Sequence, residues 1–153
     1  MSLRIATIGS SDEGALAALF QAIALDAGAL EHFRPHPFTA SEAHARANYI
    51  GQDLYALMTY SREVVGYGML RGWDEGFRIP SLGIYIPRPH RGTGASRVLM
   101  NYLQFAAKLK GAEGIRLKVH DDNERAFRLY SSLGYRFKDE RENNQRVGVC
   151  ELR

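Results

Sequence analysis

A strand that runs through a glycine-rich turn into a long helix is the feature that most constrains this chain. The segment reads Ile84-Tyr85-Ile86-Pro87-Arg88-Pro89-His90-Arg91-Gly92-Thr93-Gly94-Ala95-Ser96. The two prolines stop the strand, and apolar residues then recur at helical spacing over residues 95–109. The first amides of a helix lack partners within the helix and carry partial positive charge. The segment therefore predicts an anion-binding turn at the start of a helix.

Glycines and arginines in the turn strengthen this prediction. Gly92 and Gly94 have no Cβ, so an anion can approach the backbone amides closely. Arg88 and Arg91 can add full positive charges. The alternative interpretation is an ordinary glycine turn with solvated arginines. Neither the nucleoside-triphosphate loop nor the dinucleotide fingerprint fits, because no lysine follows Gly94 and because Arg97 stands where the fingerprint needs glycine.

The rest of the chain predicts one α/β (α+β) domain over residues 1–153. Alternating or apolar runs predict strands at residues 3–8, 53–60, 64–71, 81–86, 115–120, 135–140 and 146–152. Helical spacing and end signals predict helices at residues 10–28, 40–48, 95–109 and 123–133. This order predicts a mixed sheet covered by helices.

Capping residues add detail to the first two helices. Ser10 with Glu13, and Thr39 with Glu42, have the spacing of a capping box, in which each partner satisfies a free backbone amide of the other. Gly28 is expected to end the first helix, because glycine readily adopts the left-handed conformation of helix ends.

Composition is that of an ordinary globular protein without marked charge bias. The 153 residues carry 20 Lys plus Arg against 17 Asp plus Glu, a formal net charge of +3. Since the charges form no run or stripe, we expect no nucleic-acid or membrane partner. One cysteine, Cys150, precludes an internal disulfide, and the sequence shows no signal peptide and no apolar run of about 20 residues. A cytoplasmic location fits these features.

A second segment makes the first one more specific. Residues 115–135 read as a strand, an asparagine, a short helix, and then a glycine followed by an aromatic residue. Together with residues 91–96, this segment resembles the GNAT superfamily of acyl-coenzyme A N-acyltransferases, and the likeness covers essentially the whole chain. The matching positions of the second segment are Asn123, Ala126, Leu129, Tyr130, Leu133, Gly134 and Tyr135. The resemblance implies a mixed, mostly antiparallel sheet of about seven strands flanked by about four helices.

The resemblance also implies a reaction, the transfer of an acetyl group from acetyl-coenzyme A to a primary amine of a small molecule, without a metal. The amides expected to hold the pyrophosphate are those of Arg91, Gly92, Thr93, Gly94, Ala95 and Ser96. The strand backbone expected to pair with the pantetheine arm is that of Ile84, Tyr85 and Ile86. Ser96 departs from the usual Gly or Ala, but its hydroxyl can donate to a phosphate. Asn123 would offer its amide to the arm, and Tyr130, two helical turns on, would be the general acid for the departing thiolate.

Attack requires a neutral amine, and a direct base is not evident in the sequence. Many members of the superfamily carry a glutamate on the strand before the turn, whereas residues 81–86 contain no carboxylate. The nearest candidates are Asp74, Glu75 and His36. Each has a simpler interpretation as a solvated turn or loop side chain, and a water relay through Tyr85 or Ser81 is equally open.

Residues 32–38 form an unusual connector, with two histidines, two phenylalanines, an arginine and two prolines. In the superfamily this region helps to line the acceptor site, and such side chains suit a small polar ring such as an amino sugar. The candidate acceptor-binding residues are Phe33, Arg34, His36, Trp73, Asp74 and Glu75. In the alternative interpretation, Phe33 and Phe38 form a hydrophobic plug under the sheet.

Two other functions compete with a small-molecule acetyltransferase. A non-catalytic acyl-coenzyme A-binding or regulatory module would explain the missing strand carboxylate, although Tyr130 and the complete turn argue against it. A protein N-terminal or lysine acetyltransferase needs an open groove for an extended peptide, whereas the prolines in residues 32–38 favour a covered site. The resemblance leaves the acceptor and the acyl chain length open, and it allows a homodimer.

Overall fold

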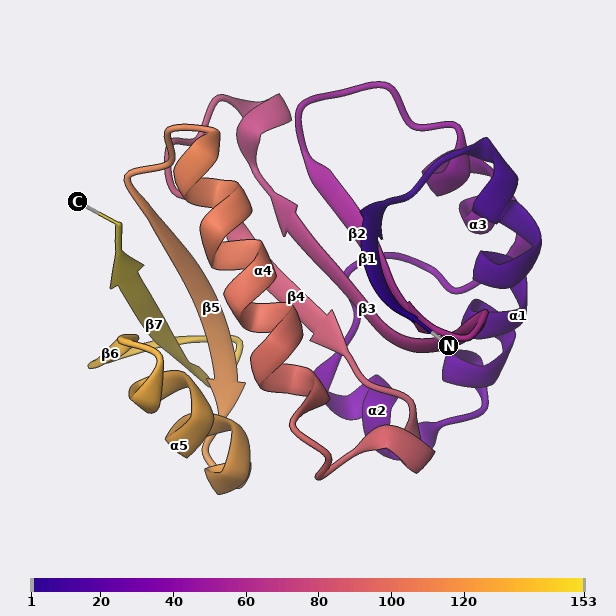
Figure 1. The fold of residues 1–153 in the computed structure, drawn as a ribbon. Coiled ribbons are helices and arrows are strands. Elements are labelled where there is room, and N and C mark those ends of the chain that lie inside the picture. The colour runs from indigo at the N-terminus through magenta and orange to yellow at the C-terminus, as the bar shows by residue number, and fades with distance from the viewer. Residues whose placement is uncertain (1, 153) are drawn as a thin grey trace.

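Seven strands form one open sheet in the computed structural model, which describes residues 2–152 (Figure 1). The strands are β1 (Leu3–Thr7), β2 (Leu54–Tyr60), β3 (Glu63–Arg71), β4 (Ser81–Tyr85), β5 (Gly114–His120), β6 (Arg136–Glu142) and β7 (Gln145–Glu151). Their order across the sheet is β1-β2-β3-β4-β5-β7-β6, and every neighbouring pair is antiparallel except β4 and β5. The predicted mixed, mostly antiparallel sheet is confirmed.

Helices cover both faces of this sheet. They are α1 (Glu13–Ala24), α2 (Ala27–His32), α3 (Ala40–Ala47), α4 (Ala95–Leu109) and α5 (Glu124–Ser132), with 3₁₀ turns at η1 (Ser10–Asp12), η2 (Trp73–Glu75) and η3 (Arg88–His90). Figure 1 shows α4 lying along the centre of the sheet, while α1 and α3 lie beside β1 and β2, and α2 lies near the carboxyl end of β4. Within residues 2–152, no helix has both the length and the apolar character needed to cross a membrane.

Alternation along the central strands explains why there are two cores. Successive side chains of a strand point to opposite faces. Ala56 and Met58 of β2 lie in the cluster formed with α4, whereas Tyr55 and Leu57 lie in the cluster formed with α1. Both faces of β2 are buried, so its sequence is apolar almost throughout. Each large apolar side chain buried in this way stabilises the fold by roughly 1.5–3 kcal/mol.

The caps of the first two predicted helices differ in outcome. Ser10 opens the 3₁₀ turn η1, and Asp12 rather than Ser10 accepts the capping hydrogen bond from the preceding loop. The Ser10–Glu13 capping box is therefore wrong. The Thr39 cap of α3 is confirmed, because its hydroxyl accepts from the Glu42 amide at 3.0 Å.

An extra short helix lies where a helix end and a loop were predicted. α1 ends at Ala24, and α2 follows with Asp26 as its N-cap, whose carboxylate accepts from the Ala29 amide at 3.2 Å. Gly28 lies inside α2, so the predicted helix end at Gly28 is wrong and one more helix is present than expected. The added helix brings His32, its last residue, to the end of β5.

β4 and β5 are parallel and pair only near their beginnings. Their register pair is Ser81 opposite Arg116, and their carboxyl ends separate toward the starts of α4 and α5 (Figure 1). Ligand sites of α/β sheets form beyond the carboxyl ends of such separating strands. A functional site is therefore expected between these two strand ends.

Candidate functional site

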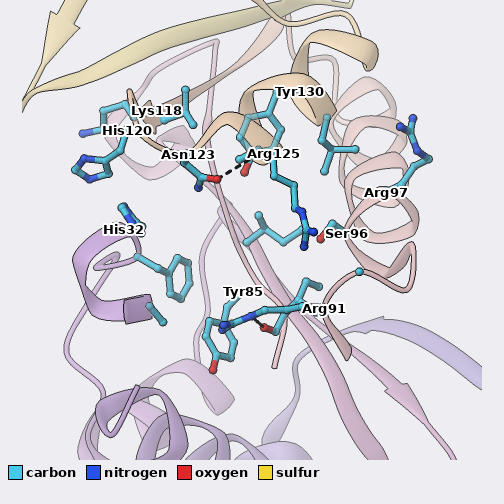
Figure 2. Close-up of a pocket in the computed structure, with 18 of the residues that line it drawn as sticks. His32, Tyr85, Arg91, Ser96, Arg97, Lys118, His120, Asn123, Arg125 and Tyr130 are labelled. Carbon is cyan, nitrogen blue, oxygen red and sulfur yellow. Dashed lines mark hydrogen bonds between the residues drawn. The ribbon is translucent and has the colours of Figure 1, made fainter. Parts of the chain in front are cut away.

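A cavity of about 380 Å³ lies between the separated ends of β4 and β5. Ile84, Tyr85 and Ile86 line it from β4 and the residue that follows, and Asn123 and Tyr130 line it from the start and interior of α5 (Figure 2). A volume of this order is typical of ligand-binding pockets. Both sequence motifs are thus brought to one cavity.

The glycine turn borders this cavity at the first turn of α4. Gly92 and Gly94 have φ angles of +77° and +91°, in the left-handed region that favours glycine. Gly94 is the N-cap of α4, and no side chain caps the helix. A Cβ on Gly94 would meet no protein atom within 4 Å, so the uncapped amides are open to a ligand.

The other residues of the turn contribute unequally to the cavity wall. Ser96 lines the cavity. Thr93 and Ala95 are not among its lining residues: the Thr93 hydroxyl donates to the His90 carbonyl, and Ala95 begins α4. Any contribution of these two residues to ligand binding would therefore come from their backbone.

Asp26 holds both arginines that were expected to offer free positive charge. Arg88 Nη2 donates to Asp26 Oδ1 and Arg91 Nη2 donates to Asp26 Oδ2, each at 3.0 Å. The Arg91 Nε–H also donates to the Ile86 carbonyl at 2.9 Å. Arg91 lines the cavity, but its charge is balanced by a carboxylate, as is that of Arg88. Contrary to the sequence-based expectation, their positive charges are already paired.

Asp26 remains ionised because its hydrogen bonds outweigh its burial. Burial alone would raise the pKa of Asp26, but donation from the Ala29 amide, from both guanidinium groups and from the Tyr85 hydroxyl lowers the pKa from 3.8 to about 2. One carboxylate thus joins α2, β4 and the glycine turn. Sequence reasoning missed Asp26, because its capping position became visible only once α2 was separated from α1.

Arg97 and Arg125 are two further cations that sequence reasoning missed. Both line the cavity near the turn (Figure 2). Arg97 Nη2 donates to Ser132 Oγ at 3.1 Å, whereas Arg125 has no ion-pair partner within residues 2–152. A Cβ on Gly92 would lie 4.0 Å from Arg125 Nη1, which places this guanidinium beside the turn. Arg97 directly follows the first motif and Arg125 lies inside the second, so their positions in the sequence were the available signal.

Asn123 and Tyr130 reach the cavity in different ways. The Asn123 side-chain oxygen caps α5 by accepting from the Ala126 amide at 3.3 Å, which leaves its NH₂ group able to donate to a ligand. The Tyr130 ring centroid lies 6.0 Å from that of Tyr135. Burial raises the pKa of Tyr130 to about 12, so its phenol is protonated at neutral pH. It is suited to donate a proton rather than to accept one.

A second cavity of about 660 Å³ adjoins the first. The residues that line both cavities are His32, Phe33, Lys118, His120 and Gln145. The charged residues that line the second cavity are Glu31, Arg34, Arg71, Glu75, Arg116, Lys118 and Glu142. Arg116 pairs with Glu142 at 2.7 Å, whereas no ion pair engages Glu75 within the described residues. Charges of both signs suit a small polar molecule.

Three of the six predicted acceptor residues line this cavity, and the other three do not. Phe33, Arg34 and Glu75 line the second cavity. Phe33 also packs in the core beneath the sheet, 5.8 Å from Phe38 between ring centroids, so the hydrophobic-plug interpretation describes part of its surroundings. Ser81 lines the second cavity and Tyr85 lines the first, as a water relay between them would need.

His36 lies away from both cavities, among buried aromatic rings. Its Nε2 is 2.7 Å from the Tyr67 hydroxyl and its Nδ1 is 2.7 Å from the Pro37 carbonyl oxygen. Burial lowers the pKa of His36 and favours the neutral ring. Both ring nitrogens are engaged inside the protein, so the structure gives His36 no access to a ligand in either cavity.

Trp73 and Asp74 also lie outside both cavities. Trp73 packs against the α4 side of the sheet, with Lys110 Nζ 4.7 Å from the centre of its ring system. Asp74 accepts hydrogen bonds from the Tyr49 hydroxyl and, at 2.8 Å, from the Gln52 amide. Their contacts fix the turn before β4. Of the three base candidates, Glu75 alone lines a cavity.

Comparison with known proteins agrees with this geometry. The acetyltransferase (GNAT) family matches residues 21–135, about three quarters of the chain, and the protein therefore belongs to the GNAT family. Uncharacterised N-acetyltransferases of Mycobacterium bovis and Mycobacterium tuberculosis are 33% identical over 98 residues, which is 62% of this chain and 62% of theirs. The matched part thus spans less than two thirds of these relatives.

Solved structures share the whole fold. The GNAT domain of S. lividans PAT superimposes with a TM-score of 0.80 at 15% identity, over 98% of this chain and 90% of that one. PaiA N-acetyltransferase from Thermoplasma acidophilum, solved in complex with coenzyme A, gives 0.78 at 15% identity, over 99% of this chain and 100% of that one. At these identities the likeness concerns the fold, and the predicted GNAT-like architecture is confirmed.

Proposed function

We propose that this protein transfers an acetyl group from acetyl-coenzyme A to a primary amine of a small molecule. One observation carries the proposal: an uncapped helix start and a protonated phenol line the same cavity, and that cavity adjoins a second, charged one. The first feature suits a diphosphate, the second a leaving thiolate, and the third a polar acceptor. Membership of the GNAT family supports the same reaction.

The residues of the first cavity fit coenzyme A. The amides of residues 91–96 would hold the pyrophosphate, and the open space over Gly94 leaves room for it. Arg125, which has no ion pair among the described residues, would add the positive charge that Arg88 and Arg91 do not have free. The backbone amides and carbonyls of residues 84–86 would form hydrogen bonds with the pantetheine arm, and the Asn123 NH₂ group would donate one to it.

The transfer step needs one acid. The neutral amine nitrogen attacks the carbonyl carbon of the thioester, a C–N bond forms, and the C–S bond breaks with its electron pair going to sulfur. The nitrogen, positively charged after attack, releases one proton to solvent, and the proton that Tyr130 gives to sulfur is replaced from solvent. Tyr130 would donate its phenolic proton, or a hydrogen bond, to that sulfur, because its pKa of about 12 keeps the proton in place until charge develops.

The acceptor amine would lie in the second cavity. Near pH 7 an alkylammonium must lose a proton before it can attack. We propose that Glu75 receives this proton, directly or through water near Ser81 and Tyr85, since Glu75 lines the second cavity and lacks an ion-pair partner among residues 2–152. Phe33 and Arg34 would contact the acceptor, and an amino sugar fits their mixture of apolar and charged groups.

The proposal also covers the domain organisation, location and oligomeric state of the protein. Residues 1–153 would act as a single acyltransferase domain in the cytoplasm; the single cysteine and the one sheet that contains all seven described strands support this. A homodimer stays a prediction, which native mass spectrometry of the untagged chain would test.

Coenzyme binding is the first test. Acetyl-coenzyme A at millimolar concentration should raise the melting temperature, because a ligand that binds only the folded state stabilises it by mass action. Gly94→Glu should abolish this shift, since it adds bulk and negative charge to the open turn. Gly111→Glu is the matched control: Gly111 also has a positive φ, +80°, and open space, but at the other end of α4. An equal shift in both variants would remove the turn from the proposal.

Turnover is the second test. Release of the free thiol should be followed with amino sugars, polyamines, amino acids, aminoglycosides and a lysine peptide as acceptors. We expect a small polar amine to be acetylated faster than the peptide. A thermal shift without turnover on any acceptor would instead favour the non-catalytic coenzyme-binding alternative.

A further inference from the structure

Two histidines and an aspartate meet at the wall shared by the two cavities. His32 ends α2, His120 ends β5, and Asp122 lies two residues further on. One ligand atom from each of the three side chains lies within 4.8 Å of the other two. Figure 2 shows the rings of His32 and His120 next to each other at one side of the pocket. Segments almost 90 residues apart are thus joined here.

These three side chains are not committed to other partners. The His32 and His120 rings contact each other with their centroids 4.5 Å apart, and within residues 2–152 no hydrogen bond or ion pair engages the side chain of either histidine or of Asp122. The neighbouring Asp121 differs, because Arg141 and Arg146 lie 3.3 Å and 3.5 Å from its carboxylate. Donor atoms without partners are free to bind a ligand of their own.

The donor set selects the class of ligand. Two imidazole nitrogens and one carboxylate oxygen are ligands that Zn²⁺, Co²⁺ and Ni²⁺ accept, whereas Mg²⁺ and Ca²⁺ prefer oxygen alone. Ligands about 2.1 Å from a tetrahedral metal lie about 3.4 Å from one another. His32 and Asp122 are exposed, so rotation of their side chains can close the present spacing to that value. The nearby cation Lys118 is offset by Glu142 at 3.5 Å.

We propose that His32, His120 and Asp122 form a binding site for one divalent transition-metal ion, and that an ion bound there inhibits acetyl transfer. The inhibition rests on the proposed function, because His32 and His120 line both cavities and a metal held between them would stand where coenzyme and acceptor meet. The binding itself does not depend on any activity.

The binding test uses the untagged full chain and Co²⁺ as the probe. Titration should give one saturable equivalent with the visible absorption of nitrogen-ligated cobalt, and Zn²⁺ should displace it. His32→Ala and Asp122→Asn should each weaken binding at least tenfold. His44→Ala, which removes an α3 histidine that is paired with Glu13 and lines neither cavity, is the matched control and should bind cobalt as wild type does. Absence of a saturable equivalent, or an unchanged affinity in both site variants, would overturn the proposal.

The inhibition test separates this proposal from the proposed function. Zn²⁺ should lower the acetylation rate of the wild type in proportion to its occupancy, and Asp122→Asn should need at least tenfold more Zn²⁺ for the same effect. Full activity of wild type with the site occupied would refute the inhibitory role. If no acceptor is ever acetylated while cobalt binds as expected, the proposed function fails and the metal site stands.

Discussion

Asp26 is the residue that most changes the expectation for the predicted anion-binding turn. Its carboxylate accepts hydrogen bonds from Arg88 and Arg91, so these guanidinium groups brace the turn instead of facing a ligand. The net gain in stability from these pairs is limited, since desolvation of the buried Asp26 carboxylate offsets part of its attraction to the arginines. Positive charge for an anion must then come from the helix start and from Arg125.

The pH dependence of stability follows from the same carboxylate. The pKa of Asp26 is lowered from 3.8 to about 2 in the folded protein, so its stabilising effect is present above pH 4 and is lost as pH falls toward 2. Asp26→Asn should cost about 1–2 kcal/mol at pH 7, a value discounted because the Arg88 partner is largely in solvent. Urea unfolding at pH 7 and pH 3 measures this, and the gap between the two proteins should be smaller at pH 3. An equal gap at both values would contradict the assignment.

The proposed acid role of Tyr130 predicts a kinetic effect of replacing this single residue. Tyr130→Phe should lower kcat by about 10²-fold, which is typical for loss of a general acid, while the thermal shift with acetyl-coenzyme A stays as in wild type. Because the pKa of Tyr130 is about 12, the wild-type rate should show no decline due to this group between pH 8 and pH 10. A descending limb in that interval that disappears in the variant would show that the phenol titrates earlier and acts differently.

At the scale of elements, α5 depends on one residue for both its start and its proposed contact with the ligand. The Asn123 oxygen caps the helix, and the NH₂ group of the same side chain is left for the cavity. A nine-residue helix of this kind needs its cap, because short helices are marginal without packing and capping.

Two substitutions separate these roles. Asn123→Ser keeps a good cap and removes the long amide, so the unfolding free energy should stay within about 0.5 kcal/mol of wild type while the KM for acetyl-coenzyme A rises about 3- to 10-fold, the worth of one neutral hydrogen bond. Asn123→Ala should show the same rise in KM and also lose about 1 kcal/mol of stability. Equal KM values for Asn123→Ser and wild type would place the amide outside the coenzyme site.

At the scale of the whole molecule, the sheet is divided by the weak pairing of β4 and β5. Each half has its own antiparallel strands, and β4 and β5 share the single register pair of Ser81 and Arg116. A ligand that bonds to the backbone of both strands would supply the contacts that the sheet lacks there.

Hydrogen exchange tests this role of the ligand. Acetyl-coenzyme A should slow amide exchange in residues 84–86 and 118–120, which line the cavity, while residues 55–58 of β2 serve as the internal control. Since exchange reports local opening, slower exchange throughout the molecule without a local maximum at these strand ends would argue against a ligand that bridges β4 and β5.

Much of this architecture could be predicted from local patterns. Gly92 and Gly94 predict a turn with positive φ, and the helical spacing of residues 95–109 predicts α4. Both predictions succeed because these structures depend mainly on residues close together in the chain. The prediction for residues 10–28 was wrong because the apolar periodicity continues past Ala24, where α1 ends. Asp26 could be recognised as the cap of a new helix only once that end was known.

What the sequence by itself determined is the family, the order of the seven strands along the chain, and the helices α3, α4 and α5, since these follow from residue type and spacing. What only the tertiary structure decided is which distant side chains meet. The packing of α2 against the sheet brings Asp26 to Arg91 and His32 to His120, and it leaves His36 buried against Tyr67. Such contacts depend on how the helices and strands pack in space, and the sequence pattern of one element does not specify which other element packs against it.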